Sequence, residues 1–179
     1  MPPWLRKLAL VVHVTASVGW TGSVAAFLAL ALVGLQSQDA ILVSGMYLAM
    51  DVTAAYVIVP LSIASLASGV VQSLGTSWGL FRHYWVLAKL LITAVSTFLL
   101  ITHTRGISYV ADIAGQMALG SGDLRELRVQ LAVDAAAAIG VLLVTTLLSV
   151  YKPRGLTPYG WRKQREQRAG ARAADTASS

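Results

Sequence analysis

The amino-acid sequence predicts an all-α, polytopic membrane protein, a bundle of four transmembrane helices with both termini in the cytoplasm. Four apolar runs, residues 8–35, 52–74, 85–102 and 131–150, each approach or exceed the roughly 20 helical residues that cross a hydrocarbon core of about 30 Å. A mean hydropathy of +0.66 and a charged fraction of only 12% agree with this class. The runs are expected to be helical because lipid offers no partner to an unpaired backbone N–H or C=O.

The first two helices are expected at residues 5–35 and 51–75. Basic residues precede the first run, as in a signal peptide, but its apolar stretch is far longer than a signal-peptide core of roughly 7 to 15 residues. We therefore expect a retained helix. Asp51 is expected at the start of the second helix, where the helix dipole favours a negative charge, and Pro60 is expected to kink that helix near its middle.

The third and fourth helices are expected at residues 84–104 and 124–151. Between them, apolar residues recur at helical spacing over residues 107–119, which predicts a short helix along the membrane surface or over the mouth of the bundle. Asp123 and Glu126 form a capping-box-like start for the fourth helix. That helix is therefore expected to begin outside the membrane.

Basic residues set the predicted orientation. Arg6 and Lys7 precede the first helix, Arg82 precedes the third, and seven of the fourteen Lys and Arg residues lie from Lys152 onward. The connection after the first helix, residues 36–51, contains no Lys or Arg. The positive-inside rule therefore places both termini in the cytoplasm.

The chain divides into a four-helix transmembrane domain, residues 1–151, and a basic tail, residues 152–179. Pro153, Pro158 and the polar composition that follows predict a disordered cytoplasmic tail that interacts loosely with anionic lipid headgroups. A nucleic-acid or protein partner for the tail is the less favoured alternative, and we expect no nucleic acid among the partners. The absence of cysteine excludes disulfides, thiolate metal sites and iron–sulfur ligation.

Ionisable side chains inside the apolar runs mark the candidate site. A Lys or Asp at mid-bilayer costs about 2.5 to 3.5 kcal/mol, so such residues usually face a partner, a cofactor or water. His13 and Trp20 share one face of the first helix, and Trp85 and Lys89 share one face of the third. At a rise of about 1.5 Å per residue, His13 and Lys89 lie about 8 Å and about 6 Å inside their helices. Their side chains can therefore meet in the cytoplasmic half of the bundle, in the same layer as Gln72.

A second polar layer is expected at the opposite end of the bundle, from Asp51, His103 and Asp134. His103 and Asp134 form either an ordinary interhelical hydrogen bond or an entry point for protons or copper. The sequence does not decide between these roles.

The residues around the inner pair resemble a known pattern. His13-Val-Thr-Ala-Ser-Val-Gly-Trp20-Thr-Gly22 and Trp85-Val-Leu-Ala-Lys89 are similar to motifs of small bacterial inner-membrane proteins. These are a family of unknown function grouped with CopD-type copper-resistance domains, and the HemJ-type protoporphyrinogen oxidases. The resemblance covers roughly residues 5–151 and implies a compact bundle in the bacterial inner membrane.

In the HemJ-type enzymes, the first-helix His and the Lys of the Trp-x-x-x-Lys motif are implicated in binding haem b. The resemblance therefore implies this role for His13 and Lys89. The HemJ-type pattern continues with an aromatic residue, a Pro-Arg pair and a Tyr-His pair toward the end of the first helix. This chain departs from it there, because residues 27–34 contain no base or cation.

Three functions stay open at this point. The first is a haem b-binding redox protein, oxidase-like or electron-transferring, with His13 and Lys89 as iron ligands, Trp20 and Trp85 beside the haem, and Gln72 in the same layer. Imidazole is a usual axial ligand, and a neutral Lys amine is a rarer one. Such a protein needs a membrane redox partner.

The second function is a component of copper or small-solute transport, although the four methionines form no internal ladder and soft cysteine ligands are absent. The third is a non-catalytic membrane scaffold, in which His13 bonds a carbonyl or a serine between helices and Lys89 reaches toward the cytoplasmic interface. Small-residue faces on the first two helices permit a homodimer without requiring one.

Overall fold

The structure is a computed structural model that describes residues 2–75, 83–115, 122–151 and 155–178, with only the backbone described within 103–124 and from 171 onward. In chain order the elements are α1 (Pro3–Gln36), α2 (Ala40–Thr53), the π-helical turn η1 (Ala54–Ile58), α3 (Val59–Gly75), α4 (Tyr84–Gly115), α5 (Gly122–Tyr151) and α6 (Pro158–Ser178). The described residues form helices and no strand, which confirms the predicted all-α class.

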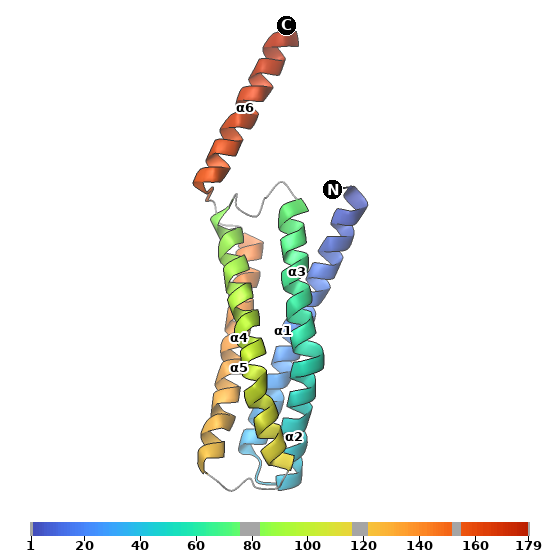
Figure 1. The fold of residues 1–179 in the computed structure, drawn as a ribbon, viewed down its shortest axis with the longest axis vertical. Coiled ribbons are helices and arrows are strands. Elements are labelled where there is room, and N and C mark those ends of the chain that lie inside the picture. The colour runs from blue at the N-terminus through green and yellow to red at the C-terminus, as the bar shows by residue number, and fades with distance from the viewer. Residues whose placement is uncertain (1, 76–82, 116–121, 152–154, 179) are drawn as a thin grey trace.

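Four helical stretches are long and apolar enough to cross a membrane: Pro3–Gln36, Ala40–Gly75, Tyr84–Thr102 and Arg125–Tyr151. They lie side by side in one bundle, with the N-terminus and the start of α6 at the same end (Figure 1). Large apolar side chains cover the outside of this bundle; Val18, Leu91 and Phe98 are each 66% exposed. An outer surface of this kind suits lipid and not water, so the fold is that of a multi-pass membrane protein.

The second crossing helix begins at Ala40, which corrects the predicted start at Asp51. Asp39 caps α2, because its carboxylate accepts hydrogen bonds from the backbone N–H groups of Ile41 at 2.9 Å and Leu42 at 3.3 Å. Val43, Tyr47 and Met50 then follow at helical spacing and are buried. Apolar periodicity therefore extends the helix by about three turns, and Asp51 lies inside it and not at its start.

The expected distortion at Pro60 takes the form of the π-helical turn η1 directly before it. Proline has no backbone N–H, and its ring crowds the carbonyl four residues earlier, so the regular α-helical hydrogen bonding cannot continue through this position. The N–H of Val59 instead reaches back five residues to the carbonyl of Ala54. The helix continues beyond Pro60 as α3, which carries several residues of the candidate site.

The third predicted helix is longer than expected, because α4 continues to Gly115. Most of the separate helix expected at residues 107–119 is thus part of α4, and residues 116–119 lie outside the described residues. The fourth helix, α5, begins within two residues of the predicted start.

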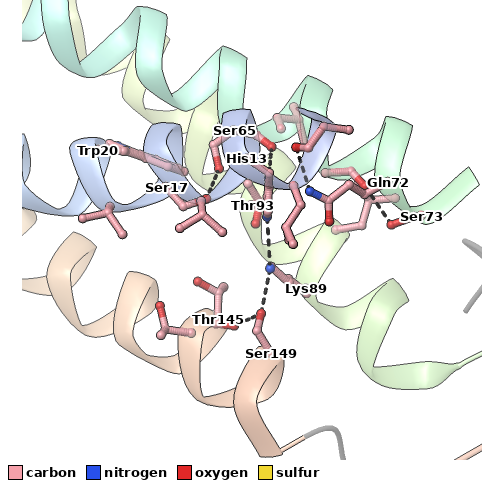
Figure 2. A pocket seen from close by; sticks show the side chains of 18 of the residues that line it. His13, Ser17, Trp20, Ser65, Gln72, Ser73, Lys89, Thr93, Thr145 and Ser149 are labelled. Atoms are coloured by element: carbon pink, nitrogen blue, oxygen red, sulfur yellow. Dashed lines mark hydrogen bonds between the residues drawn. The ribbon is translucent and has the colours of Figure 1, made fainter. Parts of the chain in front are cut away.

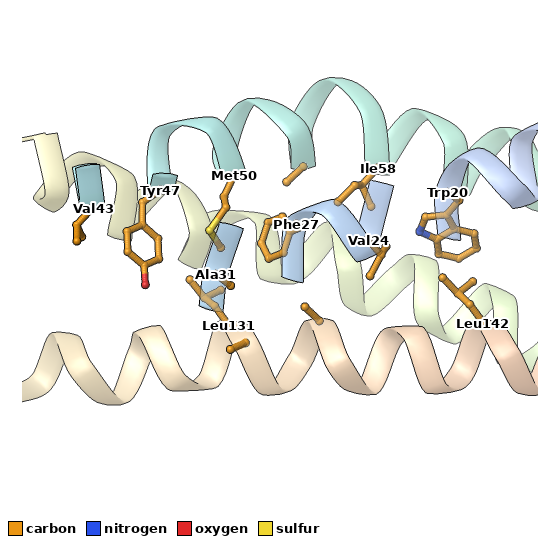
Figure 3. Packing of buried hydrophobic residues seen from close by; sticks show 13 residues of the cluster. Trp20, Val24, Phe27, Ala31, Val43, Tyr47, Met50, Ile58, Leu131 and Leu142 are labelled. Atoms are coloured by element: carbon orange, nitrogen blue, oxygen red, sulfur yellow. The ribbon is translucent and has the colours of Figure 1, made fainter. Parts of the chain in front are cut away.

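The apolar core occupies the half of the bundle away from the N-terminus (Figure 3). It is built from one face of α1, the facing side of α2 and η1, and α5, and its largest members are Trp20, Phe27, Tyr47, Met50, Ile58, Leu131 and Leu142. In lipid, such a core is stabilised mainly by close packing and interhelical hydrogen bonds. The half nearer the N-terminus is different, since polar side chains face the interior there.

The C-terminal tail, which the sequence predicts to be disordered, is helical over Pro158–Ser178, in α6. Thr157 caps the helix, because its Oγ1 accepts a hydrogen bond from the N–H of Gly160 at 3.1 Å, and Pro158 suits the first helical position. Most of the remaining residues are good helix formers, and Lys163 pairs with Glu166 at 3.5 Å. Polarity indicated disorder, but local capping and helix propensity favour a helix that points away from the bundle (Figure 1).

Candidate functional site

A cavity of about 1100 Å³ opens in the half of the bundle nearest the N-terminus, between α1, α3, α4 and α5. All five residues that the sequence selected line it: His13, Trp20, Gln72, Trp85 and Lys89. They come from three different helices, and Figure 2 shows His13 and Lys89 directed toward one another across the cavity. The sequence prediction that these two side chains meet at one level is confirmed by their contact.

The imidazole of His13 is held by α3. Its Nδ1 lies 3.1 Å from the carbonyl oxygen of Ser65 and 3.1 Å from the hydroxyl oxygen of Ser68. A carbonyl can only accept, and the Ser68 hydroxyl donates its own proton to the carbonyl of Ala64 at 2.6 Å. We therefore assign the ring proton to Nδ1, which leaves the lone pair of the neutral ring on Nε2, facing the cavity.

Gly69 makes this position of the ring sterically possible. A Cβ at residue 69 would lie 3.2 Å from Cε1 of His13 and 3.6 Å from its Nδ1. The glycine lets α3 approach α1 closely enough for the hydrogen bonds at Nδ1 to form. Sequence reasoning gave Gly69 no role and missed this contact.

Lys89 contacts two other helices through its amine. Nζ donates a hydrogen bond to Oγ of Ser149 on α5 at 2.7 Å and lies 3.5 Å from Nε2 of His13 on α1. Ser149 in turn donates to the carbonyl of Thr145 at 2.9 Å. The amine therefore lies inside the bundle, at the centre of a hydrogen-bonded path from α3 through α1 and α4 to α5.

The two tryptophans and Gln72 line different parts of the cavity. Trp20 is 4% exposed and forms the boundary with the apolar core. Trp85 is half-buried near the start of α4, and its ring centre lies 6.3 Å from that of His83. Gln72 ties α3 to α1, because its amide donates to the carbonyl of Ala9 at 2.8 Å. This bond uses the amide nitrogen, so Gln72 is first a helix-joining residue.

Hydroxyl groups supply most of the remaining polar surface. Ser17 on α1 and Ser65 on α3 share a hydrogen bond of 2.8 Å beside His13. Arg6, Lys7 and Lys89 are the charged residues in the part of the lining that the structure describes, and no carboxylate is among them. Across the described residues generally, no group of three or more His, Asp or Glu side chains gathers to bind a metal ion. The cavity is therefore a cationic, hydroxyl-lined site with one ring nitrogen available as a ligand.

The predicted outer polar layer lies partly outside the described residues. Asp134 accepts a hydrogen bond of 3.5 Å from Gln130 one turn earlier in α5, Asp51 lies within the second crossing helix, and the side chain of His103 lies outside the described residues. Whether His103 and Asp134 pair stays a prediction.

A different polar contact joins the helices at that end. Nε of Arg128 donates to the hydroxyl of Tyr47 at 3.0 Å, and Nη2 donates to the carbonyl of Gly34. The guanidinium also lies 5.5 Å from the centre of the Tyr47 ring, within range of a cation–π interaction. Sequence reasoning treated residues 36–51, which include Tyr47, only as a connection and gave Arg128 no partner, so it missed the pair.

Comparison with known proteins found no family model, no curated protein and no solved structure that matches the chain. The fold and the cavity define a multi-pass helical membrane protein with a polar site inside its bundle.

Proposed function

We propose that this protein binds haem b in the cavity, with His13 and Lys89 as the iron ligands, and has an oxidase-like or electron-transfer role in the bacterial cytoplasmic membrane. Both termini are proposed to lie in the cytoplasm, as the distribution of basic residues predicts. The observation that carries the proposal is the placement of Nε2 of His13 and Nζ of Lys89, 3.5 Å apart inside a cavity of about 1100 Å³.

The chemistry of His13 fits a metal ligand. Histidines that bind metals almost always donate their second ring N–H to a carbonyl, a carboxylate or water, which fixes the tautomer and the ring orientation. Nδ1 of His13 donates to the carbonyl of Ser65, and its lone pair at Nε2 points into the cavity. This orientation places Nε2 within 3.5 Å of Nζ of Lys89, the second proposed ligand.

The separation of the two nitrogens is close to the value that a shared metal would need. Metal–imidazole bonds are about 2 Å long, so an ion between Nε2 and Nζ needs about 4 Å between them. The present separation of 3.5 Å is about half an ångström less than this value. The flexible four-carbon stem of Lys89 can supply that change, and Ser149 keeps the amine on the correct side of the cavity.

The size and walls of the cavity suit a large, mostly apolar cofactor. Typical small-molecule sites have volumes of about 300 to 1,000 Å³, and this cavity, at about 1100 Å³, is slightly larger. Leu10, Val14, Leu90 and Leu143 provide apolar wall, and a Cβ at Gly22 would meet no atom within 4 Å. Bound haem would supply one-electron redox chemistry, whose potential the axial ligands and the burial set. The chain's own part is to hold the two ligand nitrogens and to exclude water with this wall.

Absorption spectroscopy of detergent-purified protein, oxidised and dithionite-reduced, tests the proposal. The wild-type protein, reconstituted if needed, is expected to show a Soret band with stoichiometric haem. His13→Ala should remove or convert that band, and Lys89→Ala should leave a five-coordinate, high-spin spectrum, since imidazole is the stronger ligand. His83→Ala is the matched control, because His83 lies outside the cavity lining and should leave the spectrum unchanged.

Two results would overturn the proposal. If both cavity variants keep the wild-type spectrum, other residues hold the cofactor. If wild-type protein binds no stoichiometric haem, the hydrogen bonds of His13 and Lys89 serve only to join helices, and the scaffold function stands in its place. Copper transport is less favoured, because no group of three His, Asp or Glu side chains gathers among the described residues.

A further inference from the structure

The geometry points to a carboxylate-binding subsite at the mouth of the cavity: Arg6 and Lys7 bind the anionic groups of an amphiphilic ligand whose apolar body lies deeper, against His13 and Trp20. This inference rests on the proposed function, because haem is such a ligand, with two carboxylates on one edge of an apolar macrocycle. It adds an orientation and a specificity that the two iron ligands alone do not give.

The wall that α1 contributes changes character along its length. Arg6, Leu10, His13, Ser17 and Trp20 follow one another at steps of four, three, four and three residues, so they share one face of the helix, and all five line the cavity. From the mouth inward, the wall therefore presents a cation, an apolar side chain, a ligand nitrogen, a hydroxyl and an indole. A ligand with one anionic edge can match this order in only one orientation.

The spacing along the helix suits a single ligand. Arg6 lies seven residues and Lys7 six residues before His13, which corresponds to about 10 Å and about 9 Å of helix rise. Apolar wall from Leu10 fills the interval. An anion at the edge of a ligand bound to His13 would thus lie within reach of both long basic side chains.

The electrostatics of the cavity favour an anion. Its described lining has two cations near the mouth, Arg6 and Lys7, and no Asp or Glu. Lys89 is not counted with them, because an amine that binds iron is neutral. In the part of the chain that the structure describes, Arg6 and Lys7 form no ion pair; Lys163 and Glu166 in α6 form the pair found there. Charges interact more strongly at the edge of a low-dielectric bundle than in bulk water, and a carboxylate taken from water needs such a partner.

A phosphate of an anionic lipid headgroup could supply the same charge, because basic residues near a membrane surface attract such lipids. Both sources share the chemistry of an oxyanion bound by adjacent Arg and Lys side chains. The cavity favours the carboxylates of its own ligand, because the two cations belong to the lining that leads to His13. Binding measurements in bilayer discs with and without an anionic lipid separate the two sources.

Titration of the purified protein with haem and with haem dimethyl ester, in bilayer discs of zwitterionic lipid, tests the subsite. The ester keeps the iron and the macrocycle but carries no carboxylate. The double variant Arg6→Gln/Lys7→Gln is expected to bind haem about tenfold more weakly than wild type and to bind the ester equally well. The control is Arg162→Gln/Lys163→Gln, which removes an identical Arg-Lys pair from α6, outside the cavity lining, and should change neither affinity.

The outcomes separate the subsite from the proposed function. If wild type binds haem and its ester equally, and the double variant does not discriminate between them, the subsite is wrong while haem binding stands. If wild type binds neither ligand, both proposals fail. Discs that contain phosphatidylglycerol address the lipid source: loss of that lipid's binding in the double variant, with an unchanged ratio of haem to ester affinity, would assign the anion to a headgroup and overturn the subsite.

Discussion

Replacing Gly69 by Ala tests how the fold holds the ring of His13. The new Cβ would lie 3.2 Å from Cε1 of His13, whereas carbon atoms pack best at about 3.5 to 4.0 Å. The ring must therefore move by about half an ångström. Its hydrogen bonds from Nδ1 to Ser65 and Ser68, both 3.1 Å, then lengthen or break.

Opposing terms set the expected magnitude. Loss of a hydrogen bond costs about 0.5 to 1.5 kcal/mol, and overpacking costs about 1 to 3 kcal/mol. Alanine in place of glycine in a helix gains about 1 kcal/mol. The free energy of unfolding should therefore fall by roughly 0.5 to 3.5 kcal/mol. Haem affinity should fall by about 10- to 100-fold, the range for lost support of a metal-bound histidine.

The assay combines haem titration at the Soret band with unfolding of the same preparations in detergent. Gly140→Ala is the matched control, because Gly140 also lies inside a helix, α5, but outside the cavity lining, and no atom lies within 4 Å of its Cβ position. We expect the control to keep wild-type affinity. Wild-type affinity and spectrum in Gly69→Ala would refute the role of the close contact. Equal losses in both variants would show that the loss does not depend on the contact with His13.

Further predictions concern the tautomer, the polar contacts and the topology. In the apo protein, ¹⁵N NMR of a variant that keeps His13 as its single histidine should show a protonated Nδ1. A proton on Nε2 alone would contradict the assigned tautomer. Arg128→Ala should lower the free energy of unfolding, measured in detergent, by about 2 kcal/mol, and Tyr47→Phe should lower it by less. An unchanged free energy of unfolding would mean that the contact does not stabilise the fold. Ser149→Ala removes the acceptor of the cavity amine and should shift the haem spectrum without loss of binding. Single cysteines should label from the periplasm at Ser37 and from the cytoplasm at Ala169; labelling of Ser37 only from the cytoplasm would reverse the topology.

The class of fold was predictable because lipid imposes strict limits on helix length and composition. Apolar length alone predicted all four crossing helices. The predicted start of the second helix was Asp51, whereas in the structure this helix begins at Ala40. The charge at Asp51 was read as a boundary, while the actual boundary is the cap at Asp39. The polar tail was likewise predicted to be disordered, because that prediction used the average composition of the whole segment. The helix observed there depends on local features at its start, the cap at Thr157 and Pro158 at the first helical position.

The main side chains of the candidate site were predictable because ionisable residues are rare inside apolar runs and helical spacing fixes their faces and depths. That reasoning selected His13 and Lys89, which lie in contact. It could not find the groups that hold them, since a backbone carbonyl, a close glycine contact and a serine such as Ser149 have no distinctive sequence pattern. These contacts depend on the relative rotation of helices, which a single sequence does not determine.

The division of the bundle into two halves bears on the choice between a bound cofactor and a transport path. The polar cavity ends at Trp20, and beyond it the interior is filled by side chains such as Ala31, Tyr47 and Met50, each 0% exposed. Arg128 ties α5 to α1 and α2 across this closed half. A solute path would have to separate that core and break those bonds, whereas a cofactor needs only the open half. The architecture therefore favours a resident ligand that enters from the end where Arg6 and Lys7 lie.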